Sequence, residues 1–177
     1  MLRLFNVSIH DVSLALWQLS HDVVVLGNLR LALQRIARSH WQPLGTLRSW
    51  GHVPLHREAD VLLAPCAQSE AIWLGCWLEE GEGPSRVVII DPVSGYHGFA
   101  VLPSDFQIGV LHRSGSPDLP ISLPTACAHR FRLELACIEK LAVIPFLLLS
   151  PLEWSERAAR NVPEPLGQPP PLPPLLG

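Results

Sequence analysis

The segment that decides the fold is AIWLGCWL at residues 71–78, followed after a polar turn by RVVII at residues 86–90. The first run is apolar on both faces of an extended chain, and the second consists mainly of β-branched residues, which favour buried strands. The residues DPVSG at 91–95 have the composition of a tight turn, and the chain returns in a further strand at 96–102. This pattern predicts a sheet that is covered on both sides.

Further strands are predicted on the C-terminal side of this segment, at residues 106–113, 129–138 and 141–149. Pro145 interrupts the last of them, so we expect that strand to lie at a sheet edge or to bend there. Short strands at regular spacing, separated by turn residues, are typical of a sandwich. The predicted fold class is α+β, with a C-terminal antiparallel β-sandwich, a mixed helical N-terminal segment and a short C-terminal helix.

The N-terminal part gives a less uniform pattern. Alternating residues predict a strand at 3–10, and Asn28 is a suitable N-cap for a helix that ends near Ser39. On this predicted helix, Arg30 and Arg38 share one face and Arg35 lies nearby. We interpret that basic face as solvated surface or, if the protein has a partner, as a candidate contact.

The C-terminal part contains the clearest local motif. Ser150 and Glu153 have the spacing of a capping box, with proline at the first helical position, and they predict a short helix. The tail PEPLGQPPPLPPLLG favours extended polyproline II structure or disorder, and its residues Leu172 and Leu175 are suited to docking. The predicted organisation is a mixed α/β segment at 1–60, a β-sandwich core at 61–150, the helix at 151–161 and the proline-rich tail at 162–177.

The composition suggests that part of the surface is covered by a partner. Hydrophobic residues make up 48% of the 177 residues and charged residues only 16%, against about 25% charged in an average soluble domain. A small domain needs charged surface to stay dispersed. We therefore expect another protein, or a second copy of the chain, to cover apolar side chains.

Several classes of protein are not favoured by the sequence. The longest apolar run, residues 141–149, is far shorter than the about 20 residues of a membrane-spanning helix. The first ten residues lack the apolar stretch of a secretion signal, so a cytoplasmic location is expected. Six arginines stand against four acidic residues in the first 60 positions, too weak a basic excess to predict nucleic-acid binding. The four cysteines lack the close spacing of a zinc site and are interpreted as structural thiols.

One group of residues suggests metal binding. In an extended chain His52, His56 and Glu58 would share one face, because side chains alternate along a strand. Two imidazoles and one carboxylate form a ligand set suited to iron or zinc. The alternative interpretation is a half-exposed edge strand whose polar side chains contact water.

Two tryptophans in loop-like sequence, Trp41 and Trp50, suit an interface, the mouth of a ligand site or packing of loops over the core. The sequence contains no nucleophile elbow, phosphate-binding glycine loop or kinase motif. Our leading hypothesis is a non-catalytic interaction subunit or adaptor that binds, stabilises or presents a substrate to another protein. The alternatives are a small metal-dependent enzyme using His52, His56 and Glu58, and a β-sandwich that binds a small ligand.

Overall fold

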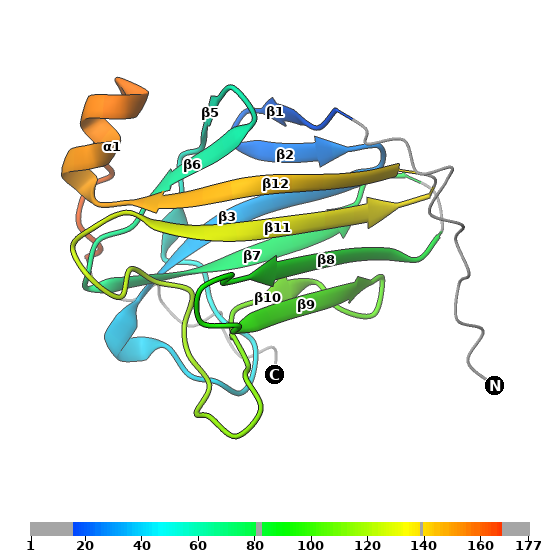
Figure 1. The fold of residues 1–177 in the computed structure, drawn as a ribbon, viewed down its shortest axis with the longest axis horizontal. Coiled ribbons are helices and arrows are strands. Elements are labelled where there is room, and N and C mark those ends of the chain that lie inside the picture. The colour runs from blue at the N-terminus through cyan, green and yellow to red at the C-terminus, as the bar shows by residue number, and fades with distance from the viewer. Residues whose placement is uncertain (1–15, 81–82, 139, 168–177) are drawn as a thin grey trace, which may run out of the picture.

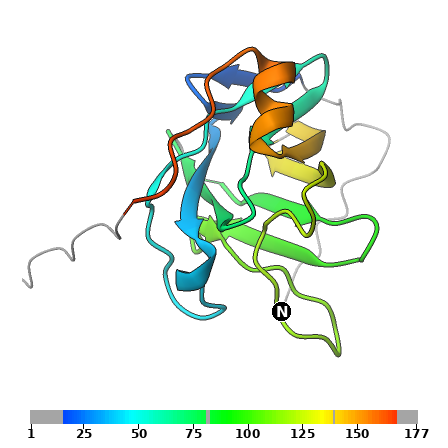
Figure 2. The same ribbon diagram turned by 90° about the vertical axis from the view of Figure 1, so that its left-hand side faces the viewer.

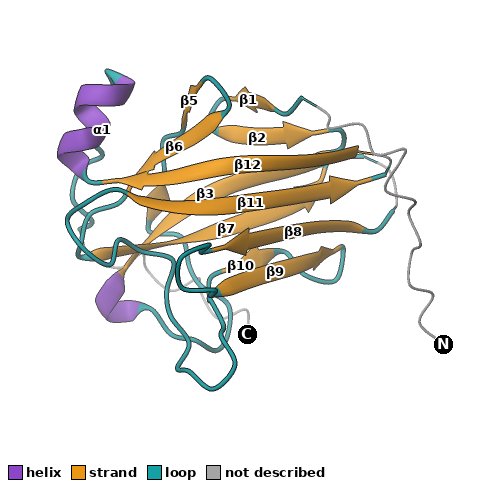
Figure 3. Ribbon diagram, in the orientation of Figure 1, coloured by secondary structure: helices purple, strands orange, loops and turns teal. Residues whose placement is uncertain are grey.

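The computed structural model describes residues 16–80, 83–138 and 140–167. These residues form mainly β-strands, arranged in two sheets, together with one short α-helix and one turn of 3₁₀ helix, η1 (Arg38–His40) (Figure 3). The β-rich character predicted from the sequence is confirmed. Within the described ranges, no helix is long and apolar enough to cross a membrane.

The first sheet has the strand order β1-β2-β3-β7-β10, and β4 pairs with β3 beside this path. All its pairs are antiparallel. β3 and β7 pair along their whole lengths, so residues from both sides of position 60 share this sheet. The strands are β1 (Gln18–Ser20), β2 (Val23–Leu26), β3 (Leu29–Ala37), β4 (Gly51–His52), β7 (Glu70–Leu78) and β10 (Gln107–Ile108).

The second sheet has the order β5-β6-β12-β11-β8-β9 and faces the viewer in Figure 1. Its pairs are antiparallel except β6–β12, which is parallel, so the prediction of a purely antiparallel sandwich was wrong at this pair. The strands are β5 (His56–Glu58), β6 (Val61–Pro65), β8 (Ser85–Ile90), β9 (His97–Leu102), β11 (His129–Cys137) and β12 (Lys140–Leu149).

The main core lies between the two sheets, an arrangement consistent with a β-sandwich. Alternate residues of β3 and β7 in the first sheet pack against alternate residues of β8, β11 and β12 in the second. These side chains are almost completely buried; they include Leu31, Leu33, Ile72, Leu74, Val87, Ile89, Leu133, Leu135, Ile144 and Phe146.

The helix predicted at residues 28–39 was wrong, because this segment forms β3. Gly27 and Asn28 make a two-residue hairpin turn between β2 and β3, and Gly27 has a φ of 56° that glycine adopts without strain. Leu31 and Leu33 point into the core, but Ala32 and Ile36 on the opposite face are buried as well. A strand buried on both faces loses its two-residue alternation, and here the remaining polar residues happen to match a helical period.

The edge position expected at Pro145 holds only for the first part of the strand, because β12 as a whole lies between β6 and β11. Pro145 stands opposite Arg132 of β11, whereas pairing with β6 begins only at the next residue, Phe146. The proline therefore sits where one side of the strand is still unpaired, and its missing N–H leaves no gap in the ladder.

The predicted strands at 71–78, 86–90, 96–102 and 129–138 are confirmed within a residue or two. Of the strand predicted at 106–113, the structure retains only the two residues of β10 and isolated bridges. The C-terminal helix α1 (Pro151–Ala158) has the predicted capping box: Glu153 N–H donates to Ser150 Oγ, and Ser150 N–H donates to Glu153 Oε2. The strand predicted at 3–10 lies outside the described residues.

Candidate interaction surface

The two sheets meet at two long edges, and one of them is closed by polar contacts. This closed edge is formed by β1, β5 and the end of α1 (Figure 1). Asp22 Oδ1 accepts hydrogen bonds from Leu55 N–H and from Arg160 Nη1, both at 2.8 Å. Arg57 donates to Trp17 O at 2.7 Å, and its guanidinium lies 4.2 Å from the centre of the Trp17 ring. Burial alone would raise the pKa of Asp22, but the bonds from Arg160 and Leu55 outweigh it and lower the pKa.

The opposite edge, formed by β9 and β10, is lined by apolar side chains instead. We call it the open edge and define it by Trp77, Phe99, Val101 and Phe106. Twelve large apolar side chains are exposed among the described residues, and these four are exposed by 43%, 58%, 41% and 56%. Trp77 belongs to β7, next to β10, while Phe99 and Val101 project from β9. Trp77 projects from the outer face of the first sheet, and Phe99 and Val101 project from the outer face of the second. Exposed aromatic residues gathered at one edge are typical of binding surfaces.

A hollow of about 860 Å³ lies at this edge. The edge strands approach closely at Gly98, where a Cβ atom would lie 2.6 Å from Val110 O. Further along β9 the sheets part, and the hollow is lined there mainly by apolar residues: Cys76, Trp77, Leu78, Gly83, Pro84, Leu102, Pro103, Asp105 and Phe106. A second hollow of about 310 Å³ shares Asp105 with it and includes Phe99.

The backbone of β9 is mostly protected against the addition of another strand. His97 and His112 exchange N–H···O bonds of 3.0 and 2.7 Å, and the N–H of Asp105 donates to Val101 O at 2.9 Å. The carboxylate of Asp105 accepts from Val101 N–H at 2.8 Å. The N–H and C=O groups of successive residues point to opposite sides of a strand. On the side of β9 that faces away from β8, only the N–H and C=O of Phe99 remain, and no described residue bonds to them. The open edge therefore presents side chains rather than a free backbone ladder.

The outer face of the second sheet continues this surface away from the hollow. α1 covers only the end at β6 and β12, where the fully buried Trp154 packs with Leu63 and Leu149. Over β8, β9 and β11 no described element crosses the face (Figure 1). In register across these strands, Val88 lies beside Phe99 and Arg86 beside Val101.

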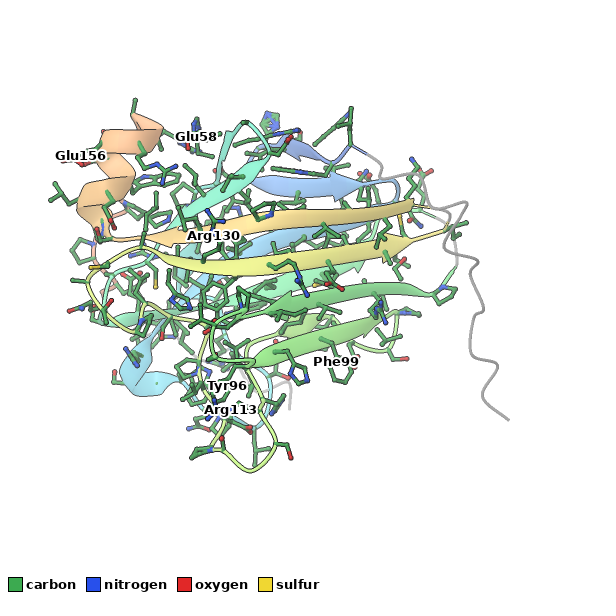
Figure 4. All side chains as sticks on the ribbon, in the orientation of Figure 1. Glu58, Tyr96, Phe99, Arg113, Arg130 and Glu156 are labelled. Carbon is green, nitrogen blue, oxygen red and sulfur yellow. The ribbon has the colours of Figure 1, made fainter. Side chains whose placement is uncertain are left out.

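Exposed arginines accompany the apolar residues on this face. Arg86 and Arg130 make no ion pair with any residue that the structure describes, and Arg132 pairs with Glu134 at 3.1 Å. Figure 4 shows Arg130 and Phe99 on the side turned toward the viewer. The chain as a whole carries a formal charge of −3, so the positive charge here is a local feature.

The three arginines proposed as partner contacts do not form one basic face, because the helix that would align them is absent. Arg30 of β3 pairs with Glu79. Arg35 is only 8% exposed and donates to Glu70 at 2.5 and 3.0 Å and to Glu164 O at 2.7 Å. Arg38 alone is exposed, at the start of η1.

Trp41 and Trp50 pack over the outer face of the first sheet. Both contact a small cluster of Ile36, Leu47 and Ala71. Trp41 Nε1 donates to Gly109 O at 2.8 Å, and the Trp50 ring lies 4.8 Å from the ring of His40. Their positions match the interpretation of loops packed over the core.

The shared face expected for the metal ligands does not exist. His52 belongs to β4 in the first sheet, whereas His56 and Glu58 belong to β5 in the second. The chain crosses between the sheets at Val53–Leu55, where Val53 N–H bonds to Leu33 O. Glu58 is engaged with Arg157. Across the described ranges, no three His, Cys, Asp or Glu side chains are grouped to hold a metal ion.

Three of the four thiols are buried, and Cys66 and Cys76 lie deepest. Burial raises the pKa of Cys66 and of Cys76 to about 12, so both stay protonated and unreactive at neutral pH.

After α1 the chain runs back along the end of the molecule (Figure 2), where the side chain of Leu166 lies beside Gly51. Leu172 and Leu175 of the tail lie outside the described residues.

The open edge was not proposed from the sequence, although one signal was readable. In HGFAVL at residues 97–102 the buried positions include Gly98 and Ala100, while the larger Phe99 and Val101 are exposed. This is the reverse of the usual pattern, in which the large apolar side chains of a strand point to the core. Comparison with protein-family models, curated proteins and solved structures found no match for the chain.

Proposed function

We propose that this protein is a non-catalytic interaction subunit or adaptor, which binds another protein through the open edge. The observation that carries this proposal is the grouping of Trp77, Phe99 and Phe106, all more than two-fifths exposed, around two adjoining hollows. Aromatic residues at the centre of an interface supply much of its binding energy when a partner removes them from water. The low charge content of the chain gives independent support, because it leaves few residues to solvate such a surface.

The side chains of the open edge indicate which residues a partner would place against them. Apolar or aromatic side chains of the partner would enter the hollow between Trp77, Pro103 and Phe106. Acidic side chains would pair with Arg86 and Arg130, which have no ion-pair partner among the described residues. Because β9 offers only the backbone of Phe99, the partner would bind mainly through side chains rather than as an added strand.

A second candidate, the binding of a small apolar ligand, is favoured by the size of the larger hollow. Its volume of about 860 Å³ falls within the 300–1,000 Å³ typical of small-molecule sites. Its one charged lining residue, Asp105, already accepts a hydrogen bond from Val101 N–H. A ligand here would be recognised mainly by shape and apolar contact.

The experiment uses tagged full-length protein expressed in its native cells. Sedimentation velocity is measured on the purified wild type and on two variants, Phe106→Asp and Leu152→Asp. Leu152 on α1 is 69% exposed and lies away from the open edge, so it is a matched control. We expect the wild type and Leu152→Asp to sediment as the same complex and Phe106→Asp to sediment as the free chain.

The experiment distinguishes the two candidate functions from each other and from the failure of both. A single chain in all three samples would contradict the proposal. If in addition an apolar dye binds the wild type but not Phe106→Asp, the small-ligand candidate would take its place. Loss of the complex in Leu152→Asp as well would mean that the surface responsible is not the open edge.

A further inference from the structure

The segment that follows α1 is held against the end of the first sheet. The carbonyl of Glu164 accepts a hydrogen bond of 2.7 Å from Nη2 of Arg35, a buried residue of β3. Two residues further on, the side chain of Leu166 lies beside Gly51 of β4, on the side of the first sheet (Figure 2). Residues 168–177 lie outside the described ranges, and the chain leads into them from this fixed position.

The outer face of the first sheet is covered at one end only. The loop after η1 packs there over Ile36 and Ala71. Toward the other end of β3 and β7, strand pairing places Val25, Arg30 and Trp77 beside one another on the same outer face. All three side chains are at least partly exposed. This part of the face is therefore accessible to another segment.

Two tryptophans make the accessible part of the face aromatic. Trp73 and Trp77 point to the same side of β7, with Gly75 between them. Trp73 Cζ3 lies 3.4 Å from the position of a Cβ atom at Gly75, so the ring extends over the glycine toward Trp77. The neighbouring Arg30 is paired with Glu79. We call Trp73, Gly75 and Trp77 the tryptophan strip, and it offers mainly apolar contacts.

The sequence of the tail suits such a strip. Residues 168–177, QPPPLPPLLG, contain no charged side chain and are rich in proline. Proline-rich segments favour polyproline II, a helix with three residues per turn, in which Leu172 and Leu175 would lie on one face. Surfaces lined by aromatic residues bind such helices, because the helix is already formed and loses little entropy on binding.

The tail is long enough to reach the strip. Gly51 and Ile72 both pair with Arg35, so they are two strand spacings apart, which is about 10 Å. Trp77 lies five residues further along β7, which adds about 17 Å in the perpendicular direction. The direct distance from Gly51 to Trp77 is thus about 20 Å, whereas residues 168–177 in polyproline II would span about 31 Å.

We propose that residues 168–177 dock as a polyproline II helix on the tryptophan strip of the same chain, with Leu172 and Leu175 against the indole rings. A short tether gives the tail an effective concentration in the millimolar range, so modest contacts are enough to hold it. Trp77 also belongs to the open edge, so the docked tail covers one residue that a partner would otherwise contact. The docking does not rest on the proposed function, because no partner takes part in it.

The test is ¹⁹F NMR of the full chain labelled with 5-fluorotryptophan, in which replacement of single tryptophans by phenylalanine assigns the resonances. Leu172→Asp places a charge against the strip and should shift the resonances of Trp73 and Trp77. The resonance of Trp154, which is fully buried beneath α1, should not move. Gln168→Asp is the matched control, because it adds the same charge to the tail on a different face of the helix, and it should leave all three resonances in place.

Dilution distinguishes the possible occupants of the strip. Docking within one chain is independent of protein concentration, so the wild-type resonances should stay in place on dilution. Movement of the resonances toward those of Leu172→Asp would show that the tail binds a second copy, and it would overturn the proposal. Identical Trp73 and Trp77 resonances in the wild type and Leu172→Asp would overturn it as well, since the strip of the isolated chain would then be free for a partner. Equal shifts in Gln168→Asp and Leu172→Asp would overturn it by showing only an effect of charge.

Discussion

The two long edges of this molecule close in different ways, although the same two sheets form both. At the closed edge Asp22, Arg57 and Arg160 join β1, β5 and the end of α1 through hydrogen bonds, and Trp17 lies beneath Arg57. At the open edge β9 and β10 meet closely only near Gly98, and Trp77 and Phe106 flank a hollow. Polar groups at the first edge are satisfied within the chain, whereas apolar groups at the second are left to solvent or to a partner.

The outer face of the second sheet shows the same contrast. Its β6–β12 end is covered by α1, with Trp154 fully buried, and its β8–β9 end carries the exposed Phe99 and Val101. α1 thus covers apolar side chains at one end of this sheet, and we propose that a partner covers those at the other end. Side chains at the closed edge should therefore contribute to folding stability, and those at the open edge to binding.

The largest expected effect tests the covered end. Trp154→Ala removes a fully buried aromatic ring and should lower the free energy of unfolding by about 3–5 kcal/mol. Leu152→Ala, on the exposed side of the same helix, should change it by less than about 0.5 kcal/mol. Urea denaturation of both variants measures the difference. Equal losses would mean that the helix contributes through its own formation rather than through the covered face.

A smaller loss is expected at the polar network of the closed edge. Asp22→Ala leaves Leu55 N–H and Arg160 without their acceptor and should cost about 1–3 kcal/mol. Asp60→Ala is the control, because the Asp60 side chain is 86% exposed and a single contact of 3.4 Å joins it to Arg57. Its effect should be close to zero. If Asp22→Ala were equally neutral, the contrast between the two edges would lose its energetic basis.

The same network should give the closed edge a dependence on pH. The pKa of Asp22 is lower in the folded protein than its ordinary value, so the unfolded chain takes up the proton more readily. The stabilisation is complete above the ordinary pKa of about 3.9 and is lost as pH falls through the lower folded value. The difference in melting temperature between wild type and Asp22→Asn should thus shrink between pH 5 and pH 2. A difference that grows on acidification would contradict the assignment.

The smallest effect on stability is expected at the open edge. Phe106→Ser should leave the free energy of unfolding within about 0.5 kcal/mol of the wild type, because Phe106 is 56% exposed. It should nevertheless reduce the fluorescence of an apolar dye bound to the protein, since the ring lines the larger hollow. A loss of stability comparable with that of Trp154→Ala would show that the open edge is part of the core.

The features predicted correctly from the sequence are those set by local patterns. The capping box at Ser150 determines where α1 begins, and the alternation in His129–Cys137 determines which face of β11 is buried. β3 was missed because both of its faces are covered, by the core and by the loop of Trp41, so its periodicity carries no strand signal. The strand propensity and hydrophobic periodicity of a segment do not indicate which other segments will cover it in the fold.

The candidate site depends on long-range pairing and was therefore harder to predict. Which strands become edges is decided by the order of strand pairing, which local sequence patterns do not determine. His52 and His56 are four residues apart, yet the intervening chain passes from one sheet to the other and separates them. The reversed sizes of Gly98 and Phe99 were the one local indication of an unusual edge.

The most direct test of the central claim is site-specific photo-crosslinking in native cells. A photoreactive amino acid replaces Phe106 at the open edge in one sample and Leu152 on α1 in the other, both at exposed positions. We predict that the residue at 106 crosslinks to one defined protein, that the crosslink disappears when Trp77→Asp is added, and that the residue at 152 gives no such product. Equal crosslinking from both positions, or none from position 106, would contradict the account.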